Sequence, residues 1–173
     1  QVVATLLNNI AIEMSDISVK KTEQTITSNV ASLYMSILAM EKTAGLLDQN
    51  LKNLEKLYQS TSNAVKVGVS EQTDADQISV QVSSMQSRIN ATKRSLEMLY
   101  NSLALQLGQG VDYHITLTQD LTEVMNADAA MELLYTDFNL DQNYDYQLLK
   151  KNTELSKKQI TLAAMDYVPT VSA

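Results

Sequence analysis

Apolar residues recur at alternating intervals of four and three over the first part of the chain. One series runs Ile26, Val30, Leu33, Ile37, Met40, Ala44, Leu47, Leu51, Leu54 and Tyr58, and a second runs Ile78, Val82, Met85, Ile89, Thr92, Leu96, Leu99 and Leu103. The mean spacing of about 3.5 residues is typical of the buried seam of a left-handed coiled coil. The pattern therefore predicts two long helices, of which the first covers residues 4–66.

The two series are separated by the one plausible turn, at Gly68. If the chain reverses there, residues facing each other across an antiparallel seam have numbers that sum to a constant. Leu51 with Met85 and Leu47 with Ile89 both sum to 136, and the centre of that symmetry is position 68. The chain has only 4 glycines and 1 proline, so few other positions favour a reversal. We predict an antiparallel helical hairpin.

The ends of the second helix are also marked in the sequence. Ser70 or Thr73 is predicted to cap its start, and Gly108 and Gly110 are predicted to end it. Gly45 lies inside the first helix but off the seam, where it is expected to cost about 1 kcal/mol relative to alanine without breaking the helix.

The pattern is looser after Gly110. Residues 113–118 alternate and are compatible with a short strand or an extended segment, residues 128–135 predict a short helix, and residues 140–145 predict a turn. Residues 147–167 predict a third helix that ends before Pro169. Its buried side is predicted to consist of Leu148, Leu155, Ile160 and Leu162.

Composition narrows the chemistry. The net charge is −7 and the basic residues are scattered, which argues against a nucleic-acid binder. Cysteine is absent, so disulfides, thiolate metal sites and cysteine nucleophiles are excluded. No run approaches about 18 apolar residues, so we expect no membrane-spanning helix. His114 lacks spaced partners for a metal, and no catalytic motif or phosphate loop is visible. We expect no cofactor and no enzymatic activity.

Several short motifs follow one another in a fixed order. They are Ala31-x-x-Tyr34-x-x-Ile37-Leu38, then Val67-Gly68-Val69-Ser70-x-x-Thr73-Asp74, then Leu103-x-x-Gln106-Leu107-Gly108, and finally Asp166-Tyr167-Val168-Pro169-Thr170-Val171. Each is weak alone, but the ordered set resembles the TolC-like outer membrane efflux proteins along nearly the whole chain.

The resemblance implies a periplasmic helical segment between two pairs of outer-membrane β-strands, in a channel that is a homotrimer. The expected fold class is all-α: a long antiparallel coiled-coil hairpin, a third helix and a small irregular equatorial segment. The expected divisions are residues 1–110 for the hairpin with its tip at 67–73, 111–146 for the equatorial segment with its short helix, 147–167 for the returning helix, and 168–173 for the start of a barrel strand.

The same resemblance suggests functional residues at the tip. It implies that Val67, Gly68, Val69, Ser70 and Thr73 meet a periplasmic adaptor protein, which joins the channel to an inner-membrane transporter. Asp74 and Asp76 are candidates for closing the periplasmic entrance, although the sequence favours the plainer explanation that both are acids that stabilise the start of a helix, Asp76 more so than Asp74. The channel would be a passive conduit for drugs or secreted proteins, and would touch the membrane only through the barrel.

Two alternatives remain at this point. A structural coiled coil or sensor stalk would explain the hairpin, but not the ordered motifs at the tip and near the C-terminal end. An all-α enzyme would need a polar cluster on the seam, where Thr92 is the single mild exception.

Overall fold

The computed structural model describes the backbone of residues 2–110, 113–125, 131–132, 135 and 137–165. The chain forms two compact units, one of Gln1–Ser28 with Asp128–Ala173 and the other of Asn29–Ala127. This grouping does not test the domain boundaries expected from the sequence, which stay a prediction.

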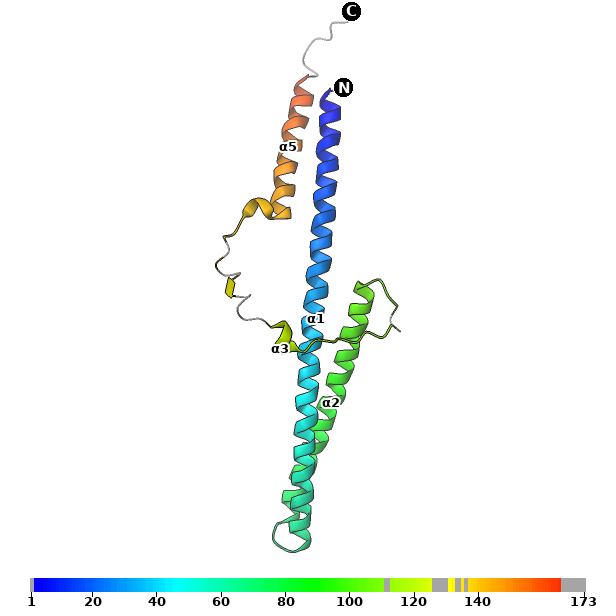
Figure 1. The fold of residues 1–173 in the computed structure, drawn as a ribbon, viewed down its shortest axis with the longest axis vertical. Helices are drawn as coiled ribbons and strands as arrows, with labels where there is room; N and C mark the ends of the chain where they lie inside the picture. The colour runs from blue at the N-terminus through cyan, green and yellow to red at the C-terminus, as the bar shows by residue number, and fades with distance from the viewer. Residues whose placement is uncertain (1, 111–112, 126–130, 133–134, 136, 166–173) are drawn as a thin grey trace, which may run out of the picture. The chain divides into compact units, whose positions relative to one another are not determined.

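Most of the described residues are helical, and none of them is in a strand. Helix α1 spans Val2–Lys66, α2 spans Gln72–Gln106, α3 spans Leu121–Val124 and α5 spans Tyr144–Met165, with a short 3-10 helix, η1, at Leu140–Gln142 (Figure 1). The all-α fold class is confirmed, and the first helix has nearly the bounds that the apolar pattern predicts.

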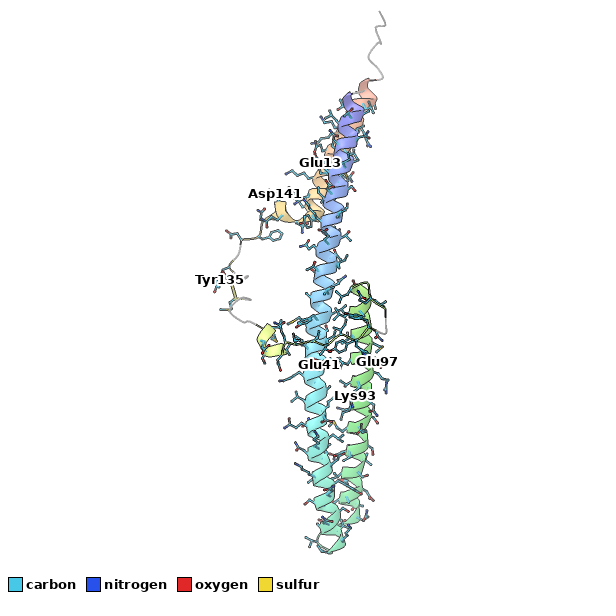
Figure 2. The ribbon with its side chains drawn as sticks, turned by 45° about the vertical axis from the view of Figure 1, so that its right-hand side comes forward. Glu13, Glu41, Lys93, Glu97, Tyr135 and Asp141 are labelled. Atoms are coloured by element: carbon cyan, nitrogen blue, oxygen red, sulfur yellow. The ribbon has the colours of Figure 1, made fainter. Side chains whose placement is uncertain are left out.

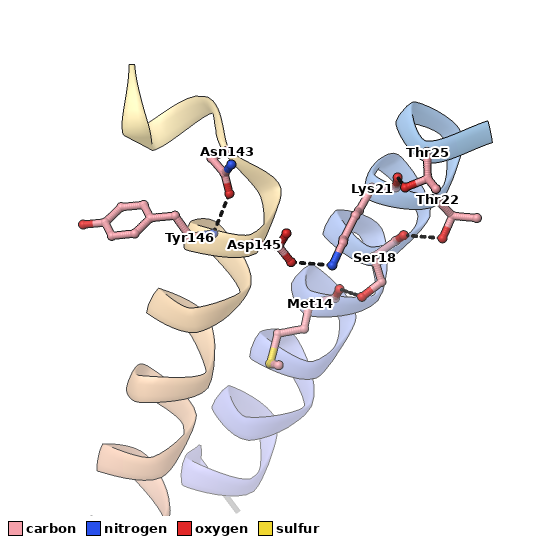
Figure 3. Close-up of polar contacts among 8 residues, drawn as sticks. All are labelled: Met14, Ser18, Lys21, Thr22, Thr25, Asn143, Asp145 and Tyr146. Atoms are coloured by element: carbon pink, nitrogen blue, oxygen red, sulfur yellow. Dashed lines mark hydrogen bonds and ion pairs between the residues drawn. The ribbon is translucent and has the colours of Figure 1, made fainter. Parts of the chain in front are cut away.

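Helix α1 stays regular although serine and threonine are frequent in it. Their hydroxyl groups donate to the backbone carbonyl four residues earlier, as Ser18 does to Met14 at 2.8 Å and Thr22 does to Ser18 at 2.9 Å (Figure 3). These bonds satisfy the side chains locally, so the helix does not have to supply other partners for them.

The α1–α2 hairpin buries the predicted seam. Every position of the two apolar series from Val30 onward is buried or half-buried except Tyr58, which is 39% exposed. Ile37, Ile89 and Leu103 are the most enclosed, at 0%, 2% and 3% exposed. The seam is therefore confirmed from Val30 to Leu54 and from Ile78 to Leu103, whereas its predicted first position, Ile26, is 45% exposed. The exact pairing of positions that sum to 136 stays a prediction.

Helix α2 ends in a Schellman motif built on Gly108. This glycine has φ +72°, its N–H donates to Leu105 O at 3.0 Å, and the N–H of Gln109 donates to Ala104 O at 2.8 Å. In this left-handed conformation the N–H groups of Gly108 and Gln109 satisfy carbonyl groups in the last turn of the helix. Glycine adopts the conformation easily because it has no Cβ. The predicted stop at Gly108 is therefore explained by backbone geometry.

The region after α2 departs in part from the sequence expectations. Residues 113–118 form no strand, so the extended alternative holds. Of the predicted helix 128–135, the structure describes Met131 and Glu132 as helical and Tyr135 as a turn. In place of the turn expected at residues 140–145 the structure has η1, then Asn143, and then the first residues of α5. Helix α5 starts three residues early because Asn143 Oδ1 accepts from Tyr146 N at 3.0 Å, an N-cap bond (Figure 3). The predicted helix end at Tyr167 and the strand at 168–173 lie outside the described residues.

Helices α1 and α5 share a seam that sequence reasoning missed. The half-buried or buried positions that follow steps of three and four are Leu7, Ile10, Met14, Ile17 and Lys21 on α1, and Tyr144, Leu148, Lys151, Leu155 and Lys158 on α5. Tyr146 and Gln147 of α5 are also half-buried. Lys151, whose side chain is 30% exposed, pairs with Glu13 and Glu154, and Lys21 pairs with Asp145 (Figure 3). The hydrogen bond to Glu13, and then that to Glu154, raises the pKa of Lys151.

This seam corrects the predicted buried side of α5. Leu148 and Leu155 lie on it, but Ile160 is 70% exposed and Leu162 is 39% exposed. The apolar pattern did not place Lys151 and Lys158 on this seam, because lysine is a polar residue, yet it can lay its apolar stem along a seam while its ammonium group stays accessible.

One helix is long and apolar enough to cross a membrane by length and composition. Over Ala4–Lys66 its best window has a mean hydropathy of 1.2, and 11% of that window is buried. The expectation of no membrane-spanning helix therefore stays a prediction. A single helix of this kind, near the N-terminal end of the sequence, is weak evidence for a membrane span.

Candidate functional site: the tip of the hairpin

The turn between α1 and α2 is a second Schellman motif. Gly68 has φ +76°, its N–H donates to Val65 O at 3.0 Å, and the N–H of Val69 donates to Ala64 O at 2.9 Å. A Cβ added at Gly68 would meet no atom within 4 Å. The glycine is therefore needed for its positive φ, and not because another group approaches it closely.

The valines on either side of Gly68 point away from the protein. Val67 is 74% exposed and Val69 is 78% exposed, whereas Ser70 is half-buried. Ala75, in the first turn of α2, is 3% exposed and belongs to the core at this end of the hairpin. The tip thus presents two apolar side chains to solvent directly above a closed core.

Glu71, which sequence reasoning missed, is the N-cap of α2. The predicted caps Ser70 and Thr73 are therefore wrong. The backbone N–H of Glu71 donates to Asp74 Oδ2 at 3.3 Å, so the Asp74 carboxylate satisfies a backbone donor that the helix itself leaves free. The preference for Ser and Thr at caps misled the prediction, although an acid three residues after the cap is a signal that could have found Glu71.

The remaining tip residues make local contacts. The hydroxyl group of Thr73 donates to Glu71 Oε2 at 3.3 Å, and Gln72 Nε2 donates to Asp76 Oδ1 at 2.8 Å. The structure therefore brings all seven predicted site residues to one end of the hairpin. Asp74 and Asp76 both make their contacts at the start of α2, with Glu71 and Gln72. These contacts fit the explanation that both are acids that stabilise the start of a helix.

The described residues contain no group of three or more His, Asp or Glu side chains that could hold a metal. His114 is exposed and lies in the segment that crosses α2, alongside Tyr113 and Glu97.

Sequence comparison supplies the family. The model of the family described as "Outer membrane efflux protein" matches residues 7–109, which is more than half of the chain. The chain belongs to the outer membrane efflux protein family. No curated protein matches the chain, and no solved structure matches it.

The match extends over most of α1, the tip and all of α2, so the hairpin is the part of the chain that carries the family likeness. Membership implies a role in an outer membrane efflux channel, and the family is one of channels and not of enzymes. Channels of outer membrane efflux proteins are generally trimers that work with adaptors and transporters. The family resemblance inferred from the ordered motifs is confirmed over residues 7–109, and the motif at residues 166–171 lies outside the match.

Proposed function

We propose that this chain is the periplasmic tunnel portion of an outer membrane efflux channel, and that the tip of its α1–α2 hairpin docks onto a periplasmic adaptor. The channel is a passive conduit that assembles as a homotrimer, and an inner-membrane transporter supplies the energy. Asp74 and Asp76 contribute to holding the entrance closed.

The observation that carries the docking proposal is the exposure of Val67 and Val69 beside Gly68. An apolar side chain that stays 74% or 78% exposed gains nothing from folding, and becomes favourable when a partner covers it. The turn itself does not demand valine. At the matching motif of Gly108 the residue that corresponds to Val69 is the polar Gln109.

The small size of this apolar patch fits a partner that binds the tip end-on. Because Ala75 already closes the core beneath it, docking does not require the hairpin to unfold. The apolar pair gives the contact its affinity, and the polar groups of Ser70 and Thr73 form the rim around it, as in other protein–protein interfaces.

Photo-crosslinking tests the proposal. A photo-reactive residue is placed at Val69 of the assembled, full-length channel in cells, and covalent products are identified by mass spectrometry. The matched control carries the same group at Gln109, which occupies the equivalent position after the other left-handed glycine. We expect an adaptor to be captured from position 69 and not from position 109. Equal capture at both positions, or none at position 69 in a folded trimer, would contradict docking at the tip.

A further inference from the structure

Met85 is a methionine in the seam of the hairpin. It lies on α2 between the seam positions Val82 and Ile89, of which Ile89 is 2% exposed, and it is itself half-buried. Leu54 of α1 and Met85 of α2 line the same hollow, so the two side chains lie close together. Figure 2 shows the side chains of both helices along this stretch, between the labelled Lys93 and the turn. Met85 therefore contributes to the packing between α1 and α2.

The hollow beside Met85 gives small solutes access to the seam. It has a volume of about 320 Å³ and is lined by Leu54, Val80, Gln81, Ser84, Met85 and Arg88. Four of these residues, Val80, Gln81, Ser84 and Arg88, are exposed, so the hollow opens to solvent. A water molecule occupies about 30 Å³ in the liquid, so the hollow admits water and molecules a little larger than water, such as hydrogen peroxide.

Two other methionines each lack one of these features. Met98 of α2 is 62% exposed and belongs to neither apolar series. Met40 of α1 is half-buried on the same seam, but it does not line the hollow at Met85. The chain has no cysteine, so no thiol in it competes for an oxidant. Met85 thus combines a place in the seam with a path for an oxidant.

We propose that Met85 is a reversible oxidation site, at which hydrogen peroxide converts the thioether to a sulfoxide and loosens the seam of the hairpin. A lone pair of the sulfur forms a bond to one peroxide oxygen, and the O–O bond breaks. The other oxygen takes both protons and leaves as water, so the sulfur is oxidised by two electrons and the peroxide is reduced by two. This inference goes beyond the proposed function and does not depend on docking at the tip.

The sulfoxide oxygen has no favourable place in the seam. Beside Leu54 and Ile89 it finds no side-chain donor, and a buried polar group without a hydrogen bond is unfavourable. Donors are present on the open side, where Gln81 and Arg88 line the hollow. A side chain that turns towards these donors satisfies its oxygen, but it leaves its place in the seam empty. Both arrangements weaken the packing between the helices.

Peroxide treatment of the full-length channel tests the proposal. Oxygen uptake at each methionine is measured by mass spectrometry of peptides, and backbone hydrogen exchange of residues 78–92 is measured on the same samples. We expect Met98 to be oxidised first, and Met85 to be oxidised well before Met40. Once Met85 is oxidised, the protection of residues 78–92 should fall about tenfold. Treatment with methionine sulfoxide reductases should restore it.

Met85→Leu and Met98→Leu form a matched pair on one helix, since leucine packs like methionine and carries no sulfur to oxidise. The response of residues 78–92 to peroxide should vanish in Met85→Leu and persist in Met98→Leu. Met85→Gln puts a polar side chain of similar length into the seam, and it should lower the protection without any oxidant.

Three results would each overturn the proposal. Oxidation of Met85 no faster than that of Met40 would show that the hollow gives no access. An undiminished loss of protection in Met85→Leu would place the effect at another residue. Unchanged protection in Met85→Gln would show that the seam tolerates a polar group at this position. None of these measurements involves an adaptor, so their outcome is separate from that of the docking proposal.

Discussion

Replacement of Gly68 by alanine isolates the contribution of one backbone angle to the hairpin. Gly68 has φ +76° and Gly108 has φ +72°, while Gly45 lies inside α1 with an ordinary helical backbone. An added Cβ meets no atom within 4 Å at any of the three positions. The same methyl group is therefore added three times without a clash, and the backbone conformation is the main variable that differs.

The expected sign follows from that conformation. An L-residue in the left-handed region costs about 1–2 kcal/mol, and the stiffer unfolded chain of an alanine variant offsets about 0.4–1 kcal/mol of this. Gly68→Ala and Gly108→Ala should each lower the free energy of unfolding by about 1 kcal/mol. Gly45→Ala should raise it by about 0.5–1 kcal/mol, because alanine is the better helix former. The two classes therefore differ by about 1.5–2 kcal/mol, or roughly 10- to 30-fold in the unfolding equilibrium.

The assay is urea denaturation followed by far-ultraviolet circular dichroism, with the midpoint compared at an unchanged slope. Gly68→Asn adds a graded control, since asparagine tolerates the left-handed region better than alanine and should lose less stability. If Gly68→Ala shifted the midpoint in the same direction as Gly45→Ala, the positive φ would not be the reason for a glycine at the tip. A much larger loss at Gly68 than at Gly108 would show that packing at the tip had been underestimated.

Three further outcomes are expected. Burial, and then the hydrogen bond to Glu41, raises the pKa of Tyr100 to about 12, so ultraviolet titration should show a tyrosine ionising near pH 12, and Tyr100→Phe should remove it. Because the pKa of Tyr100 is raised on folding, the stability that it contributes is complete below pH of about 10 and is lost as the pH rises towards 12. A titration in which no tyrosine ionises near pH 12 would contradict the raised pKa of Tyr100. Asp74→Asn keeps an oxygen for the Glu71 N–H but loses the charge, so increased channel conductance in both Asp74→Asn and Asp74→Ala would support a gating charge, whereas an increase in Asp74→Ala alone would indicate the lost cap. Lys151→Met should reduce the salt sensitivity of the hydrogen-exchange protection of α5, because its ion pairs with Glu13 and Glu154 are gone while Lys21–Asp145 remains, and an unchanged salt response would place the sensitivity in the remaining pairs.

Much of the hairpin was predictable because its determinants are local. Seam positions repeat every three or four residues, and burial confirms them from Val30 to Leu54 and from Ile78 to Leu103. The turn depends on a single glycine whose backbone angle few other residues adopt easily. The prediction of the cap at Ser70 or Thr73 was wrong by one or two residues, since several neighbouring side chains compete for the same backbone donors and local preference does not decide between them.

The sequence by itself determined the two long helices, their reversal at Gly68 and the family to which the ordered motifs point. Only the tertiary structure decided which polar side chains meet. Tyr100 and Glu41 are 59 residues apart in the chain, Tyr34 and Gln119 are 85 apart, and Lys21 and Asp145 are 124 apart. No periodicity encodes such pairs, because each depends on how irregular segments return to the helices. Seam periodicity is repeated many times and tolerates single exceptions, whereas a pairwise polar contact exists only once the fold has brought its two partners together.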